Sequence, residues 1–184
     1  MLADVSVRLE HYVTMSEELL GATFLRFSAA QLNVLASRIS DCLDRLSTEQ
    51  AWVRQHETNN AIGNLVLHLC GNLQQRILAG LGGRPDTRQR DEEFAARSGV
   101  PVAELKQRLE DTTRAAVEII AALPPERLSQ QVTVQKRTVT GLEAIYIVMD
   151  HFAQHAGQIM FATKLVTGQD LGYYRHLSKG SSGR

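Results

Sequence analysis

Two histidines stand four residues apart late in the sequence, in the stretch Asp150-His151-Phe152-Ala153-Gln154-His155. Apolar residues around them recur at a helical period, so both imidazoles are expected on one face of a long helix. Side chains four residues apart on a helix lie about 5–6 Å apart at Cβ, which lets two imidazole nitrogens reach one metal ion. The HxxxH spacing therefore predicts two ligands of a metal site.

A third ligand is predicted on another helix. His68 lies in the stretch Asn64-Leu65-Val66-Leu67-His68-Leu69-Cys70, which is the second strongly apolar helical segment of the chain. Three imidazoles match an open catalytic centre, in which the remaining coordination positions hold water or substrate. The rest of the chain is then the scaffold that brings these two helices together.

Each histidine can also be read as an ordinary boundary residue, because HxxxH pairs arise by chance on polar helix faces. The stretch lacks the H-E-x-x-H pattern of zinc proteases, since Phe152 follows His151. Asp150 falls on the opposite side of the helix, so the sequence identifies no general base and the catalytic residues are unknown. Cys70 is expected to pack in the core rather than to act in chemistry. The remaining histidines, His11, His56 and His176, are expected in loops or termini.

The composition excludes several classes of protein. The chain has 184 residues, with 20 basic and 20 acidic side chains, so no net field attracts nucleic acid or an anionic membrane. Cys42 and Cys70 have neither the spacing of a redox pair nor the number of a disulfide framework. The N-terminus lacks a signal-peptide pattern, and we expect no apolar run near the roughly 20 residues of a membrane span. These features predict a soluble, cytoplasmic protein.

Four segments carry a helical apolar period and predict an all-α four-helix bundle. Asn59 or Asn60 is expected to cap the second helix, Pro101 to open the third, and a capping box at Thr140 to open the fourth, which ends before Gly168. Residues 1–15 are expected to be a peripheral segment, 16–174 the bundle domain, and 175–184 a flexible tail. The four expected helices cover about residues 17–46, 60–80, 101–123 and 140–167.

Two connections between the helices have patterns of their own. Residues 131–140 alternate with period two, which predicts a small hairpin or extended excursion before the last helix. Residues 84–97 mix both charge signs without an apolar period, which predicts a solvated connection. Arg137, expected near the hairpin tip, is a weak candidate for contact with an anionic substrate, because exposed arginines are usually only solvated.

Three motifs together resemble those of the DinB-like superfamily, with one of its uncharacterised subfamilies as the nearest match. They are Asn-x-Ile-Gly-Asn-Leu-Val-Leu-His-Leu-Cys-Gly-Asn at 60–72, Arg90-Asp91-x-Glu93-Phe94, and His151-Phe152-x-x-His155-x-Gly157-Gln158-Ile159. The resemblance extends from about residue 24 to residue 174. It implies a DinB-like four-helix bundle in which His68, His151 and His155 hold a divalent metal, with nickel or zinc favoured and iron as a third candidate.

The resemblance also suggests an activity and partners. Superfamily members with known activity include S-transferases and isomerases that use bacillithiol or mycothiol, and many members are dimers. Our first hypothesis is therefore a metal-dependent enzyme, a transferase or hydrolase, with a low-molecular-weight thiol S-transferase as its specific form. The alternative is a non-catalytic bundle that binds a small molecule or a protein partner. We expect a small-molecule substrate, a homodimer, and no nucleic-acid or membrane partner.

Overall fold

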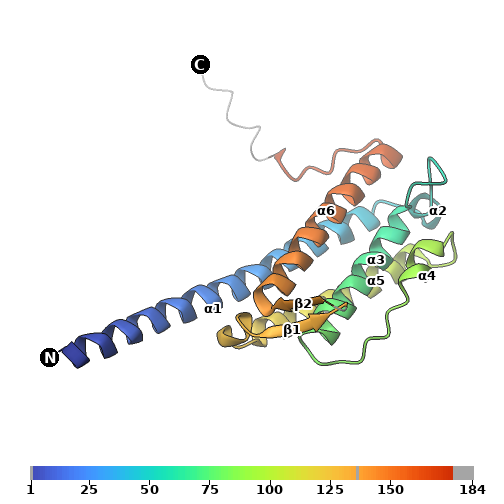
Figure 1. Cartoon of the computed structure of the whole chain (residues 1–184). Coiled ribbons are helices and arrows are strands. Elements are labelled where there is room, and N and C mark those ends of the chain that lie inside the picture. The colour runs from blue at the N-terminus through green and yellow to red at the C-terminus, as the bar shows by residue number, and fades with distance from the viewer. Residues whose placement is uncertain (1, 136, 176–184) are drawn as a thin grey trace, which may run out of the picture.

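The chain folds into a bundle of long helices, as the computed structural model in Figure 1 shows. The structure describes residues 2–135 and 137–175, with side chains from Met15 onward. Its long elements are α1 (Leu2–Leu43), α3 (Ile62–Leu73) with its π-helical continuation η1 (Gln74–Ala79), α5 (Val102–Ala122) and α6 (Gly141–Thr167). Short elements join them: α2 (Thr48–Ala51), α4 (Arg90–Ala95), η2 (Pro125–Leu128) and the strands β1 (Gln131–Val134) and β2 (Arg137–Thr140). The predicted all-α bundle with a hairpin before the last long helix is confirmed.

The four long helices bury their apolar stripes against one another. Helix α1 packs on α5 and α6, and α3 packs on the same two helices. Burying one leucine, isoleucine or phenylalanine side chain contributes roughly 1.5–3 kcal/mol, so these shared stripes supply the main stabilisation. The largest fully buried side chains come from all four: Leu32, Ile39, Leu43, Leu69, Leu73, Leu105, Leu109, Ile120, Ile145, Phe152 and Ile159.

Local signals place the ends of the helices that carry the histidines. The predicted capping box of α6 is present, because the Thr140 hydroxyl accepts a hydrogen bond from the backbone N–H of Glu143 and the Glu143 carboxylate accepts one from Thr140. Helix α6 ends as predicted at Gly168, whose φ of 67° is the left-handed conformation that glycine adopts without strain. His151 and His155 therefore lie in the middle of a well-defined helix.

Two predicted helix starts are wrong. Helix α3 is capped at Ala61 and not at Asn59 or Asn60, because the Asn64 side chain accepts a hydrogen bond from the Ala61 backbone N–H at 3.1 Å. The cap thus comes from inside the helix. Pro101 is the residue before α5 rather than its first helical residue, with an extended φ/ψ of −61°/149°.

Helix α1 is longer and more apolar than predicted. It begins at Leu2 instead of about Glu17, so the backbone at His11 is helical rather than loop, and its N-terminal part projects beyond the bundle. Residues Met15–Leu43 are long and apolar enough by length and composition to cross a membrane, which corrects the expectation that no such run exists. About a third of the most apolar window in that run is buried inside the fold. The peripheral role of residues 1–15 stays a prediction, and His176 and the tail lie outside the described residues.

The second long helix and the hairpin each contain a segment with irregular backbone geometry. The helix was predicted to run to Gly80, but its last turns, Gln74–Ala79, are π-helical. In the hairpin, Val132 pairs with Val139 and Val134 with Arg137. Gln135, at the turn, adopts a φ of 52°, which is uncommon for a residue other than glycine. The hairpin packs against η1, since a Cβ added at Gly80 would lie 2.6 Å from Val134.

Candidate metal centre

The three predicted histidines converge between α3 and α6. His68 projects from α3, while His151 and His155 lie one turn apart on α6. The Nε2 atom of His151 lies 3.0 Å from Nε2 of His68 and 3.2 Å from Nε2 of His155. One ligand atom from each residue lies within 4.8 Å of the others. His68 is buried, and the other two are half-buried.

Hydrogen bonds at two of the three Nδ1 atoms leave the Nε2 lone pairs free. Nδ1–H of His68 donates to Glu93 Oε2 at 2.9 Å, and Nδ1–H of His155 donates to Gln158 Oε1 at 2.9 Å. A guanidinium nitrogen of Arg88 lies 3.0 Å from the same His68 nitrogen. The ionised Glu93 carboxylate can only accept a hydrogen bond, so the tautomer that pairs with it carries the proton on Nδ1. In that tautomer Arg88, which can only donate, makes no second hydrogen bond to this nitrogen. Both rings thus direct an unprotonated Nε2 into the cluster.

The resulting donor set fits a divalent ion. His151 Nδ1 is buried without a hydrogen-bond partner, and its Nε2 faces two other unprotonated nitrogens. When Nε2 of His151 is also unprotonated, three lone pairs meet, and they repel one another unless a cation lies among them. At metal–nitrogen distances of about 2.0–2.1 Å and bond angles near 90–110°, two nitrogens on one ion lie about 2.8–3.4 Å apart. The observed 3.0 and 3.2 Å lie within this range.

The electrostatics of the cluster keep the imidazoles of His151 and His155 neutral. Burial lowers the pKa of His151 to about 4, and the charges of His155, His68, Arg76 and Arg88 act in the same direction. Burial also lowers the pKa of His155, although its hydrogen bond to Gln158 opposes this. Neutral imidazole is the form that binds a metal. The cluster is therefore ready to coordinate an ion at neutral pH.

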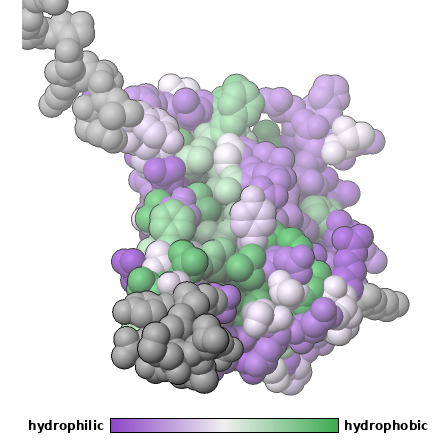
Figure 2. Space-filling view, turned by 60° about the vertical axis from the view of Figure 1, so that its left-hand side comes forward, coloured by the Kyte–Doolittle hydropathy of each residue, from purple (hydrophilic) through white to green (hydrophobic). Residues whose placement is uncertain are grey.

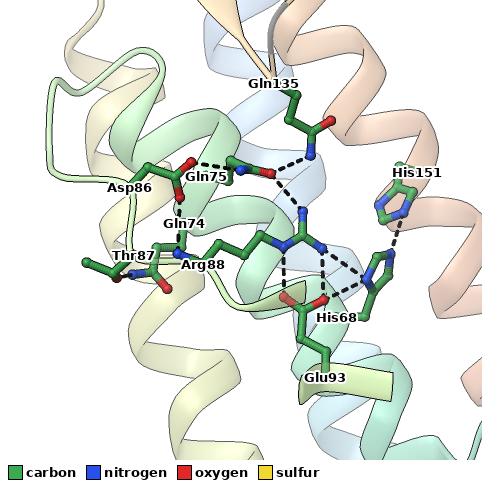
Figure 3. A network of polar contacts seen from close by, with 9 residues as sticks. All are labelled: His68, Gln74, Gln75, Asp86, Thr87, Arg88, Glu93, Gln135 and His151. Atoms are coloured by element: carbon green, nitrogen blue, oxygen red, sulfur yellow. Dashed lines mark hydrogen bonds and ion pairs between the residues drawn. The ribbon is translucent and has the colours of Figure 1, made fainter. Parts of the chain in front are cut away.

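An ion pair from the connection between α3 and α5 supports His68, as Figure 3 shows. Arg88 donates from Nε to Glu93 Oε1 at 2.7 Å and from Nη2 to Oε2 at 2.8 Å. The two side chains are only 2% and 9% exposed. Burial would raise the pKa of the Glu93 carboxyl, but its hydrogen bonds with Arg88 and His68 outweigh this and lower it. A charged carboxylate on the outer nitrogen of a metal-binding imidazole is a common supporting arrangement in metal sites.

The prediction that residues 84–97 form a solvated connection is wrong at Arg88 and Glu93. The side chains of Arg88 and Glu93 are buried, and the ring centroid of Phe94 lies 4.7 Å from that of His68, with the two rings tilted by 43°. One sequence signal was available: Gly71 follows His68 by three residues inside a helix, where glycine is disfavoured. A Cβ added at Gly71 would lie 1.9 Å from Glu93 Oε1, so only glycine lets this carboxylate reach His68.

The other candidate residues lie away from the cluster. Asp150 is exposed and accepts a hydrogen bond from Gln154, as its place on the helix predicts. Cys70 is partly buried against the core, and burial raises the pKa of its thiol to about 12, which disfavours a thiolate. His56 lies exposed in a loop. Among the described residues, Glu93 is the carboxylate that contacts the histidines, and it is already paired, so no free general base is found there.

Comparison with known proteins agrees with this architecture. A conserved protein from Enterococcus faecalis matches with a TM-score of 0.66 and 17% identity, over 78% of this chain and 97% of that one. A DinB-like protein, YjoA, from Bacillus subtilis matches with a TM-score of 0.63 and 17% identity, over 80% and 96%. A variant of the mycothiol-dependent maleylpyruvate isomerase matches with a TM-score of 0.55 and 16% identity, over 73% and 60%. A search of curated proteins finds no match.

The fold and these neighbours define the class of protein as a DinB-like helical bundle. Within that class, the family model described as "Protein of unknown function (DUF1572)" matches residues 20–179. The chain therefore belongs to this DinB-like family. The resemblance expected from its three motifs is confirmed.

Proposed function

We propose that this protein is a divalent-metal-dependent enzyme whose ion is held by His68, His151 and His155. The observation that carries the proposal is the convergence of three Nε2 atoms at 3.0–3.2 Å, with two of the outer N–H groups turned to acceptors. Nickel or zinc suits an all-imidazole donor set, and iron is the third candidate. Three protein ligands leave coordination positions for substrate.

The specific form that we favour is a low-molecular-weight thiol S-transferase. A divalent ion in such a site supplies Lewis acidity, which lowers the pKa of a bound thiol or water. The protein's own residues orient the site: Glu93 holds His68 through a hydrogen bond, and the Phe94 ring packs against its imidazole. Thiolate transfer needs less help from a base than hydrolysis does, which suits a site without a free carboxylate. The mycothiol dependence of one structural neighbour is a property of that protein and supports the proposal by analogy.

The first test is metal content, measured by mass spectrometry on protein purified without a metal-affinity column. We expect near-stoichiometric nickel, zinc or iron in the wild type and its loss in a His151→Ala, His155→Ala double variant. The matched control is His56→Ala, because His56 is an exposed loop histidine. A wild type that stays metal-free after incubation with these ions would contradict the proposal.

The alternative is a non-catalytic bundle that binds a small molecule or a protein partner. The missing free base among the described residues at the cluster is the observation that favours it. A metal-loaded protein that binds thiols but transfers none of them to an electrophile would support this alternative. Loss of thiol transfer in His151→Ala would instead support the enzyme.

We further propose that the protein is a cytoplasmic homodimer with a small-molecule substrate and no nucleic-acid partner. Large apolar side chains are exposed on α1 and α6, and Figure 2 shows apolar groups gathered on one face of the molecule. Such faces are often covered by a second copy. The mass in solution from light scattering tests this, with a monomer at micromolar concentration as the contradicting result. The exposed side chains include Leu19, Leu20, Phe27, Leu142, Tyr146 and Ile147.

A further inference from the structure

Arg76, on the π-helix η1, carries a positive charge that no described carboxylate neutralises. Its Nη2 donates to Gln135 Oε1 at 2.6 Å, which is its one side-chain hydrogen bond among the described residues. Its Nε is buried and has no partner there. A guanidinium offers five N–H donors, so most of the hydrogen-bonding capacity of Arg76 is unused in this part of the chain.

The charges around Arg76 are mostly of its own sign. Burial lowers the pKa of Arg76, and the nearby charges of Arg88 and Arg137 lower it further. Arg88 is neutralised by Glu93, but Arg137 is exposed and has no described ion-pair partner. Asp86, the other carboxylate in this network, accepts hydrogen bonds from Gln75 and from the Arg88 backbone. Two cationic side chains, Arg76 and Arg137, thus remain without a counter-charge among the described residues.

Arg76 lies near the histidine cluster, and its charge acts on His151. Arg76 follows His68 by eight residues, about two helical turns along the same continuous helix. A chain of polar contacts joins them: Gln135 bonds both Arg76 and Gln75, Gln75 accepts from Arg88 at 3.1 Å, and Arg88 contacts His68. Figure 3 shows Gln135 reaching from the hairpin into this network, with Arg88 and His68 below it and His151 to one side.

We propose that Arg76, with Arg137 beside it, forms a subsite for an oxyanion of the substrate, either a carboxylate or a phosphate. The inference rests on the proposed function, because the oxyanion belongs to a molecule whose other end reaches the metal centre. A planar guanidinium binds either oxyanion through two parallel hydrogen bonds, which Lys cannot reproduce. Arg76 could serve only to hold the hairpin through its hydrogen bond to Gln135. That role uses one N–H group and does not require a positive charge. The subsite therefore predicts a preference for anionic over neutral thiols.

The test compares two thiols of equal chain length on the cobalt(II)-loaded protein, whose visible spectrum changes when sulfur binds the metal. We expect 3-mercaptopropionate to bind the wild type about tenfold more tightly than 3-mercaptopropanol, the factor that roughly 1.4 kcal/mol provides. Arg76→Gln should abolish this preference. Arg76→Lys should restore part of it. Equal affinities in the wild type, or an unchanged preference in Arg76→Gln, would overturn the subsite.

Control variants separate charge from folding. Arg114→Gln removes an arginine that is 66% exposed on α5 and paired with Asp111, and it should keep the full preference. Arg137→Gln is the second subsite variant, because its exposed side chain can be removed without disturbing the core. It should reduce the preference by a smaller factor than Arg76→Gln does. An unchanged preference in Arg137→Gln would overturn the part of the proposal that assigns Arg137 to the subsite.

A metal-free arm distinguishes failure of the subsite from failure of the proposed function. If the wild type takes up no cobalt, the proposed function fails, and the subsite is then decided by calorimetric titration with succinate and with inorganic phosphate. Arg76→Gln should weaken binding of the preferred oxyanion several-fold, and the titrant that binds more tightly identifies it. No binding by the wild type, or equal affinities in wild type and variant, would overturn the subsite.

Discussion

The histidine cluster has two walls, the α3 wall with His68 and the α6 wall with His151 and His155, and their supporting contacts differ. On the α3 side, His68 is buried and its outer nitrogen is held by Glu93, which is itself held by two hydrogen bonds from Arg88. On the α6 side, His151 and His155 are half-buried, and only His155 has an outer partner, the exposed Gln158. The α3 wall is rigid because buried charges must stay paired. The α6 wall has weaker supports and can adjust to an ion or a substrate.

Removing the Glu93 carboxylate should have the largest effect on stability, because it leaves the Arg88 charge buried without a partner. We expect Glu93→Ala to lower the free energy of unfolding by about 3–5 kcal/mol, measured by urea denaturation of the metal-free protein. The matched control is Glu104→Ala, since Glu104 pairs with Arg108 on the surface of α5. That variant should change stability by less than about 1 kcal/mol. Similar losses in both variants would show that the buried pair has no special role.

Two glycines, Gly71 on α3 and Gly157 on α6, allow the two walls to be compared through substitutions with smaller expected effects on stability. A Cβ at Gly71 would lie 1.9 Å from Glu93 Oε1, whereas a Cβ at Gly157 on α6 would meet nothing within 4 Å. We expect Gly71→Ala to destabilise the protein by about 1–3 kcal/mol through overpacking. It should also weaken metal binding about 10–100-fold by displacing Glu93 from His68.

Gly157→Ala, two residues after His155 on α6, should instead be neutral or stabilise the helix by up to about 1 kcal/mol. Denaturation midpoints and metal titrations of both variants provide the comparison. Equal behaviour of the two alanine variants would contradict the difference between the walls.

A pH dependence is expected from the histidines on α6. The pKa of His151 is about 4 in the folded metal-free protein, against 6.5 for the free side chain. The unfolded chain therefore binds a proton that the folded protein does not, and stability should be full above pH 6.5 and fall as the pH drops toward 4. His151→Ala should reduce this slope in denaturation series across that range. The slope should persist in part, because the pKa of His155 is also lowered. An unchanged slope would be the contrary result.

The sequence predicted the features that depend on local pattern. The α6 capping box at Thr140, the stop at Gly168 and the HxxxH face all follow from residue types at short fixed spacings. The hairpin before α6 follows equally from the period-two alternation at residues 131–140. These signals need no knowledge of neighbouring elements.

The missed features depend on contacts between elements. Asn64 caps α3 because its side chain also donates to the Glu93 backbone carbonyl at 2.8 Å, and this carbonyl comes from another element. In the sequence, Arg88 and Glu93 resemble ordinary solvated charges. In the structure they are buried, because Glu93 forms ion pairs with both Arg88 and His68. A period-based reading cannot detect an ion pair that a loop delivers to a helix. The glycine at position 71, inside a helix, was the one local sequence signal of this ion pair.

The spacing of the site along the chain also sets the order in which it can form. His68, Arg88 and Glu93 lie within 25 residues of one another, whereas His68 and His151 are 83 residues apart. Closing a longer loop costs more conformational entropy, so the short segment around α3 and α4 can assemble before α6 arrives. His151 and His155 then join a half-site whose carboxylate and imidazole are already in place. Metal affinity should accordingly appear late in folding, with the docking of the last helix.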